Sequence, residues 1–218
     1  MASDRRRDWQ VGIVVGLTAE ARIARGSGCL VEIGGGTTAG AEAAVRRLIA
    51  KGATALLSFG LAGGLDPLLR PGTVLVPEAV LTKGLRIPTD AALSARLGGT
   101  TPHTLLGAEQ VAASIGAKHR LWVASGCAAV DLESGAVALA AEAHGLPFAA
   151  LRAICDPAER GLTPAALAAL DHAGAIGLFR VIASVIGKPN QLPDLLRLGR
   201  DAAAARRTLV GRAALLLR

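Results

Sequence analysis

Short apolar segments alternate with alanine-rich segments of helical periodicity along most of the chain, and this alternation restricts the fold more than any other feature. The expected strands are residues 12–15, 29–33, 55–59, 73–76, 121–124 and 149–154. Strands that alternate with helices form a mostly parallel sheet whose two faces are covered by crossover helices. We therefore expect an α/β fold, a three-layer α/β/α sandwich around a mostly parallel mixed sheet.

Helices are expected between these strands. Residues 40–50 and 134–144 place apolar side chains on one helical face, and Thr163 with Pro164 predicts a helix start that continues to about His172. Residues 193–218 read as a long basic amphipathic helix, whereas residues 82–110 read as irregular. With 218 residues and neither a linker nor an internal repeat, the chain is expected to form a single domain over residues 1–218.

The positive charge is concentrated at the C-terminal end. The net charge is +7, and the chain from Leu195 onward holds six Arg and one Asp, which leaves +2 for everything before it. With no Tyr, three Phe and two Trp there is little aromatic surface for stacking bases, so we expect no nucleic-acid partner, and a DNA-binding module is the least favoured alternative. The last helix either packs on the core with a solvated basic face or touches an anionic membrane surface.

The cysteine and histidine patterns point away from disulfides and metals. Three cysteines with no CxxC spacing favour a reducing compartment, and we expect a cytoplasmic protein, with membrane-peripheral contact as an option. Arg residues 5–7 before the apolar residues 11–19 resemble a secretory signal, but Gly12 and Gly16 fit a buried first strand equally well. The four histidines show no ligand spacing, so no metal is expected.

Two glycine-rich loops follow expected strands. Residues 34–39 match GxGxxA, but no acidic residue ends the next strand, where a dinucleotide site needs one. The loop is either a tight turn that lets a helix pack closely or a set of exposed amides that accepts a hydroxyl or an anion. Residues 58–67 form the second loop, where glycines either let the backbone approach a flat ring or serve packing alone.

Four carboxylates stand at strand and helix ends. Glu20 follows the first strand, Asp131 and Glu133 precede an alanine-rich helix, and Asp156 ends a strand, where Pro157 holds it extended. Acidic residues are common in the first turn of a helix, so each of them alone is weak evidence for a site.

The order of five segments along the chain is more informative. The segments are residues 16–20 (Gly-Leu-Thr-Ala-Glu), 58–65 (Ser-Phe-Gly-Leu-Ala-Gly-Gly-Leu), 71–77 (Pro-Gly-Thr-Val-Leu-Val-Pro), 130–133 (Val-Asp-Leu-Glu) and 151–156 (Leu-Arg-Ala-Ile-Cys-Asp). Their order resembles the purine nucleoside phosphorylase and methylthioadenosine/S-adenosylhomocysteine nucleosidase superfamily, and is most similar to its hopanoid-associated phosphorylase branch. The resemblance implies a nucleoside phosphorylase-like fold, a homo-oligomer, and an enzyme without an organic cofactor that cleaves the bond between adenine and ribose.

The resemblance also assigns roles to residues. Asp156 is expected to protonate purine N7, Glu20 to orient or deprotonate the attacking water, and Glu133 to bind the ribose hydroxyls. The other expected substrate-binding residues are Leu61, Ala62, Gly63, Asp131 and Leu132, and those of a candidate anion or nucleophile site are Gly16, Arg22 and Gly35. Asp131 has a structural role as its alternative, and Cys155 is expected to be a small buried hydrophobe rather than a nucleophile.

The choice of nucleophile and substrate stays open at the level of sequence. Leu61 stands where phosphorolytic relatives have a hydroxyl, which argues against phosphate, although inorganic phosphate remains a candidate co-substrate. The branch suggests adenosylhopane as substrate and ribosylhopane, or its phosphate, as product. A methylthioadenosine/S-adenosylhomocysteine nucleosidase of adenine and methionine salvage is the alternative enzyme, and a nucleoside-binding protein without catalysis is the alternative of another class.

Overall fold

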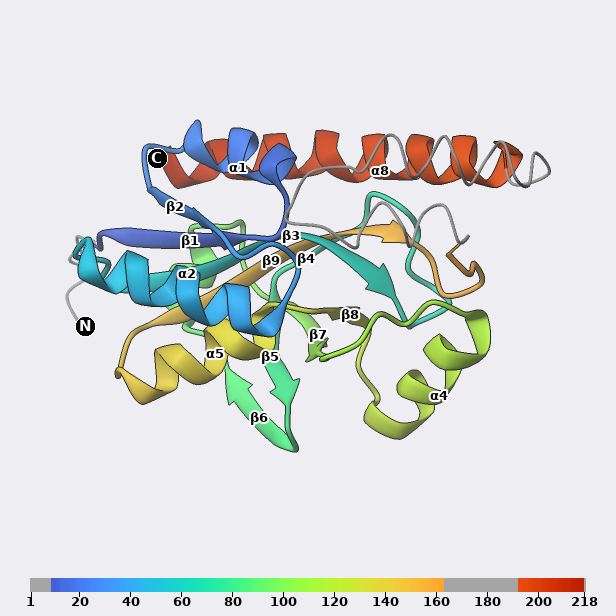
Figure 1. Cartoon of the computed structure of the whole chain (residues 1–218), viewed down its shortest axis with the longest axis horizontal. Coiled ribbons are helices and arrows are strands. Elements are labelled where there is room, and N and C mark those ends of the chain that lie inside the picture. Colours follow the sequence, from blue (N-terminus) through green and yellow to red (C-terminus); the bar gives the residue numbers. More distant parts are fainter. Residues whose placement is uncertain (1–8, 163–191, 218) are drawn as a thin grey trace.

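The structure is a computed structural model that describes residues 9–162 and 192–217. Within these residues nine strands form one mixed sheet in the order β2-β1-β3-β8-β7-β5-β6, with β9 beside β3 and β4 beside β9 (Figure 1). The strands are β1 (Val11–Val15), β2 (Leu30–Ile33), β3 (Ala55–Gly64), β4 (Val74–Leu75), β5 (Pro77–Thr82), β6 (Leu85–Pro88), β7 (Thr101–Gly107), β8 (Ala129–Asp131) and β9 (Phe148–Asp156). Five of the eight strand pairings in these residues are parallel, so the expected mostly parallel mixed sheet is confirmed.

Helices cover both faces of the sheet. On one face lie α2 (Thr38–Ala50) and α5 (Ser134–Ala143), and on the other lie α1 (Thr18–Arg25) and the long α8 (Leu192–Ala213) (Figure 1). The remaining described helices are α3 (Ala91–Ala95), α4 (Ile115–Ser125) and the 3₁₀ helix η2 (Ala214–Leu217). The helices expected at residues 40–50 and 134–144 are therefore confirmed, and the one expected from Thr163 to His172 lies outside the described residues.

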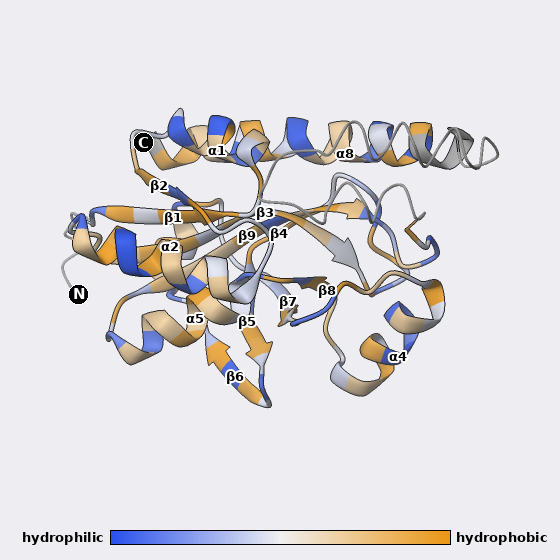
Figure 2. Ribbon diagram, in the orientation of Figure 1, coloured by the Kyte–Doolittle hydropathy of each residue, from blue (hydrophilic) through white to orange (hydrophobic). Residues whose placement is uncertain are grey.

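Alternation along the central strands creates two separate cores. Ile13 and Leu57 pack among residues of α1 and α8, whereas Val14 and Leu56 pack among residues of α2 and α5. Side chains point alternately to the two faces of a strand, so an uninterrupted apolar strand fills a core on each side. The strands in Figure 2 are accordingly hydrophobic, while hydrophilic and hydrophobic residues alternate along α8.

Two expectations for the middle of the chain are wrong. Residues 121–124 are not a strand but the end of α4, which Ser114 caps by accepting the N–H of Ala117 at 3.1 Å and which Gly126 ends in a left-handed conformation. A short apolar run fits a buried strand and a helix equally well, and these caps decide between them.

Residues 82–110 are also not irregular, because they contain β6, α3 and β7. Lys83 and Gly84 both have positive φ and turn β5 back into β6. Lysine is an unusual residue at such a turn, where Asn or Asp before Gly is the common sequence signal.

The parallel strands bring distant parts of the chain together at one edge of the sheet. β1, β3 and β9 run parallel side by side, so the segments that follow Val15, the end of β3 and Asp156 lie near one another. The last residues of β3 also pair with β8, through Gly63 and Val130, which brings Asp131 to the same place. Ligands bind at this edge in open α/β sheets.

Candidate active site

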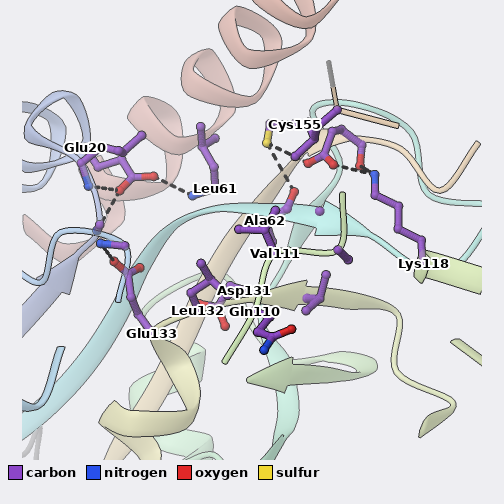
Figure 3. Close-up of a pocket in the computed structure, with 18 residues that line it drawn as sticks. Glu20, Leu61, Ala62, Gln110, Val111, Lys118, Asp131, Leu132, Glu133 and Cys155 are labelled. Carbon is purple, nitrogen blue, oxygen red and sulfur yellow. Dashed lines mark hydrogen bonds and ion pairs between the residues drawn. The ribbon is translucent and has the colours of Figure 1, made fainter. Parts of the chain in front are cut away.

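A cavity of about 170 Å³ opens at the carboxyl ends of these strands. Nine of the eleven residues that the sequence nominated line it, namely Gly16, Glu20, Leu61, Ala62, Gly63, Asp131, Leu132, Glu133 and Asp156. Figure 3 shows Glu20 and Glu133 on one side of the cavity and Lys118 and Cys155 on the other. Four acidic residues from three separate segments therefore meet in one place.

Glu20 is held rigidly although it lies in the first turn of a helix. Its Oε2 accepts the N–H groups of Gly16 at 3.0 Å and Leu17 at 2.8 Å, and its Oε1 accepts the N–H of Leu61 at 2.8 Å (Figure 3). Burial raises the pKa of Glu20, and the nearby guanidinium of Arg152 opposes that rise. The carboxyl thus caps α1, bridges α1 to β3 and still lines the cavity.

Glu133 faces Glu20 across the start of the cavity. Its Oε1 accepts the N–H of Gly36 at 2.9 Å, and its Oε2 lies 3.4 Å from Nη2 of Arg152. Burial raises the pKa of Glu133 to about 7 against the effect of Arg152, and the negative charges of Glu20 and Asp131 add to the rise. A Cβ on Gly16 would lie 2.5 Å from Oε1 of Glu133, so only glycine at position 16 leaves room for this carboxyl.

Arg152 was not nominated by sequence, yet it joins the carboxyls on this side. The side chain is buried in the middle of β9, pairs with Asp131 and Glu133, and donates to Oγ of Ser58 at 2.5 Å and of Ser134 at 3.1 Å. An arginine within the apolar strand 149–154 was the signal that could have found it, since an unpaired charge is not stable in a core. Glu20, Asp131, Glu133 and Arg152 are called the Arg152 cluster below.

Asp131 serves the structure of this cluster. It accepts the N–H of Ser134 at 3.1 Å and its hydroxyl at 2.7 Å, which caps the start of α5, and it pairs with Arg152. The carboxyl of Asp131 thus finds its partners, Ser134 and Arg152, within the protein, which favours the structural alternative over direct substrate binding.

The opposite side of the cavity holds a second buried ion pair. Nζ of Lys118, from α4, lies 2.5 Å from Oδ2 of Asp156, and the Sγ of Cys155 lies 3.3 Å from Oδ1 (Figure 3). Burial raises the pKa of Asp156, and the ammonium of Lys118 opposes the rise. Burial and the charge of Asp156 raise the pKa of the Cys155 thiol well above its ordinary value, so the group stays a thiol. Lys118, Cys155 and Asp156 are called the Lys118 cluster below.

The expected anion site is not assembled. Arg22 is exposed, and neither Arg22 nor Gly35 lines the cavity. Because Glu20 points inward from α1, a residue two positions later points to the opposite side of the helix. The amide of Gly36, a candidate donor to an anion, already donates to Glu133. Gly16 does line the cavity, but its amide donates to Glu20.

Several lining residues escaped the sequence analysis. Besides Lys118, these are the residues of the apolar wall, Val111, Ala112 and Leu162, the polar Gln110 beside it, and the loop residues Leu17 and Gly36. The apolar wall lies in loops after β7 and β9, where periodicity carries no signal. Among the described residues, no group of three or more His, Cys, Asp or Glu side chains is placed to hold a metal ion.

A family model of the phosphorylase superfamily matches residues 10–176, and the chain belongs to this superfamily. Membership of this superfamily makes the chain an enzyme that cleaves a nucleoside N-glycosidic bond. No curated protein sequence matches the chain.

Solved structures share the fold at low sequence identity. S-adenosylhomocysteine nucleosidase from Streptococcus pyogenes, with 5-methylthiotubericidin bound, has a TM-score of 0.63 at 17% identity over 73% of this chain and 86% of that one. A point mutant of the Helicobacter pylori methylthioadenosine nucleosidase, with 5'-methylthioadenosine in its active site, has 0.67 at 15% over 94% and 98%. A futalosine hydrolase mutant of Helicobacter pylori has 0.60 at 17% over 82% and 98%. These likenesses establish a nucleosidase-type fold.

Proposed function

We propose that the chain cleaves the bond between adenine and C1′ of the ribose in an adenosyl compound. One observation carries the proposal: Glu20, Glu133 and Asp156, from segments far apart in sequence, are all buried and all line one cavity. Buried carboxyls are costly unless they have a task or a partner, and a cavity that gathers three of them is suited to acid-base work on a ligand. A nucleoside-binding protein would not need all three.

The chemistry gives each carboxyl a different task. An adenine anion leaves C1′ poorly, so cleavage needs a proton on the purine, and Asp156 is the proposed donor at N7 because burial raises its pKa. The ribose becomes an oxocarbenium-like cation, which the carboxylate of Glu133 stabilises while it accepts the ribose hydroxyls. Hydrogen bonds donated by the ribose hydroxyls favour the ionised form of Glu133. Because the pKa of Glu133 is about 7, the binding of substrate can complete its deprotonation.

Water fits the nucleophile position better than phosphate. Glu20 lies beside Leu61 at the cavity edge, and Leu61 offers no hydroxyl to an anion. The guanidinium of Arg152 is already paired with two carboxylates. We therefore propose hydrolysis, in which Glu20 orients or deprotonates the water, and no cofactor takes part.

The finer proposal for the substrate is adenosylhopane, which would give ribosylhopane in hopanoid biosynthesis. The apolar wall of the cavity supports it, because Val111 is 39% exposed there and offers apolar surface to a hydrophobic 5′ substituent. The alternative is methylthioadenosine or S-adenosylhomocysteine, which fits the small cavity of about 170 Å³.

Adenine release from adenosylhopane and from methylthioadenosine, each with and without phosphate, tests these proposals. Release from adenosylhopane alone, without phosphate, supports the finer proposal. Faster release from methylthioadenosine moves the enzyme to salvage, and dependence on phosphate overturns hydrolysis. Binding of either compound without release, in a sensitive assay, would leave only a nucleoside-binding protein.

We also propose that α8 touches an anionic membrane surface and that the chain is a homo-oligomer. Leu196, Arg200, Arg207 and Val210 are exposed and share one face of α8. No described helix is long and apolar enough to cross a bilayer. Vesicles rich in phosphatidylglycerol should sediment the protein at low salt and release it at high salt, and the double variant R200Q/R207Q should bind less than the control R46Q/R120Q. Equal binding to anionic and neutral vesicles would exclude an electrostatic contact with anionic lipid, and no binding to either would exclude the membrane contact. A one-chain sedimentation mass would exclude the oligomer.

A further inference from the structure

The buried amino group of Lys118 is the most constrained charge on the cavity wall. The Lys118 side chain has no exposed surface. Besides Oδ2 of Asp156, its Nζ contacts the backbone carbonyls of Asp156 at 3.2 Å, Pro157 at 2.9 Å and Arg160 at 3.0 Å. An ammonium has three N–H groups, so these four oxygens use its whole donor capacity.

The contacts tie α4 to the turn that follows β9. One of the three carbonyls belongs to the last residue of β9 and two belong to this turn. The N–H of Leu162 also donates to the carbonyl of Ala113, just before α4, at 2.8 Å. The position of Nζ is therefore fixed by the backbone and not by Asp156 alone. Lysine on α4 reaches a carboxyl that lies thirty-eight residues away in the sequence.

The geometry leaves the two oxygens of Asp156 in different surroundings. Oδ2 is held by the ammonium, whereas Oδ1 has the Cys155 thiol at 3.3 Å as its contact among the described residues. A sulfhydryl is a weak donor, so Oδ1 keeps acceptor capacity for a proton or a ligand. Gly63 packs against both oxygens, since a Cβ there would lie 3.3 Å from each of them.

We propose that Lys118 is the positioning residue of Asp156: it holds Oδ2 in place so that Oδ1 is presented to the purine. The inference rests on the proposed function, because it assigns Lys118 a part in protonating the leaving base. Lys118 does not touch the substrate in this role.

The same pair sets the pH range of the reaction. The charged and titratable groups near Asp156 are Lys118 on α4, Cys155 on β9 and Arg160 in the following turn, and Arg160 is itself paired with Asp201 of α8. Burial favours protonated Asp156 and Lys118 favours the ionised form, so removal of the ammonium should keep Asp156 protonated to higher pH. A general acid loses activity as pH rises through its pKa, so the alkaline limb of the pH profile should move upward.

The experiment compares K118M with wild type by the pH dependence of kcat and kcat/KM for adenine release. Methionine has the length of lysine without its charge, and K51M, which removes an exposed lysine of a surface ion pair, is the matched control. We expect kcat to fall 10- to 100-fold at pH 7, KM to change less than threefold, and the alkaline limb to move up by half a pH unit or more. Wild-type kcat with an unmoved limb overturns the inference.

Two further variants and an NMR titration keep the test decisive. K118Q retains hydrogen-bond donors without charge and replaces K118M if the latter does not fold, and K118R retains charge and should keep the alkaline limb within 0.3 pH unit of wild type. NMR titration of the ¹³C-labelled carboxyl of Asp156, assigned through D156N, reads its protonation without substrate. If wild type releases no adenine, the proposed function fails while the titration still decides the role of Lys118. If wild type is active and the titration of K118M equals that of wild type, only the role of Lys118 fails.

Discussion

In the Arg152 cluster three buried carboxyls share one guanidinium, whereas in the Lys118 cluster one carboxyl faces one ammonium. The first cluster is short of positive charge, so its carboxyls compete for a single cation, and burial raises the pKa of Glu133 to about 7. The second cluster is balanced in charge: burial raises the pKa of Asp156, and the ammonium of Lys118 opposes that rise. One cavity thus holds two carboxyls in different surroundings, to which the proposed function gives different tasks: proton donation to the purine by Asp156 and acceptance of the ribose hydroxyls by Glu133.

The neighbours of each cation explain why Arg152 serves several carboxyls and Lys118 serves one. Arg152 has serine hydroxyls and carboxylates around a planar fork, which suits it to bridge several groups. Lys118 has backbone carbonyls around a point charge, which suits it to hold a single carboxyl.

The largest expected effect is on the Lys118 cluster. D156N removes the proposed proton donor, so the rate of adenine release should fall by about 10²–10⁴ while the fold is retained. It also leaves the ammonium of Lys118 without a carboxylate, and the double variant D156N/K118M should therefore be more stable to urea than D156N and equally inactive. E159Q, on an exposed side chain three residues later, is the control. Normal adenine release by D156N would remove Asp156 from the mechanism.

Removal of the shared cation should destabilise the Arg152 cluster by about 3–5 kcal/mol, because it leaves three buried carboxyls without a counter-ion. R152M should lose more stability at pH 8 than at pH 5, since ionised carboxyls are the species that need the guanidinium. Urea unfolding at both pH values measures this, with R47M, which breaks a half-exposed surface pair worth at most about 1 kcal/mol, as control. An equal loss at both pH values would mean that Arg152 acts through packing rather than charge.

A smaller effect of opposite sign is expected at Glu133. The folded-state pKa lies above the ordinary value of 4.5, so this group favours the folded state fully below about pH 4.5 and loses that contribution as pH rises through about 7. E133Q removes the cost of ionising a buried carboxyl and should stabilise the protein by up to about 3 kcal/mol above pH 7, with little change at pH 4.5. It should also weaken ribose binding. E142Q, an exposed residue of the same α5, is the control, and an unchanged free energy of unfolding at pH 8 for E133Q would contradict the prediction.

Local signals predicted the part of the sheet around the parallel strands β1, β3 and β9, whereas β5, β6, β7 and β8 were not predicted. Apolar β-branched segments with alanine-rich stretches between them correctly predicted β1, β2, β9, α2 and α5. The errors came from elements whose signals are weak: the turn at Lys83 and Gly84 lacks Asn or Asp, and residues 121–124 lie in a helix that its caps define. Tertiary contacts decide the secondary structure of such segments.

The order of the segments predicted the carboxyls of the site, but it did not predict Arg152 and Lys118, the cations that pair with them. Glu20 and Asp156 lie at the carboxyl ends of β1 and β9, which the parallel pairing with β3 brings together, and Glu133 joins them because β8 pairs antiparallel with the end of β3. Lys118 is buried because α4 packs on the turn after β9, a contact between a helix and a distant turn that no periodicity encodes. Arg22 does not line the cavity, because Glu20 points inward from α1 and Arg22, two residues later, lies on the opposite side of the helix.

The smallest effect is expected at the thiol of Cys155. The Cys155 thiol is the third member of the Lys118 cluster and donates to Oδ1 of Asp156 at 3.3 Å, which is a weak hydrogen bond next to the ion pair on Oδ2. C155A should therefore lower kcat/KM for adenine release by less than about threefold and raise the alkaline limb slightly, because a donor that favours the ionised carboxyl is lost. C29A, on a cysteine that does not line the cavity, is the control. A loss above about 100-fold would mean that Cys155 acts directly on the substrate, and the balance of the Lys118 cluster would then involve three groups rather than two.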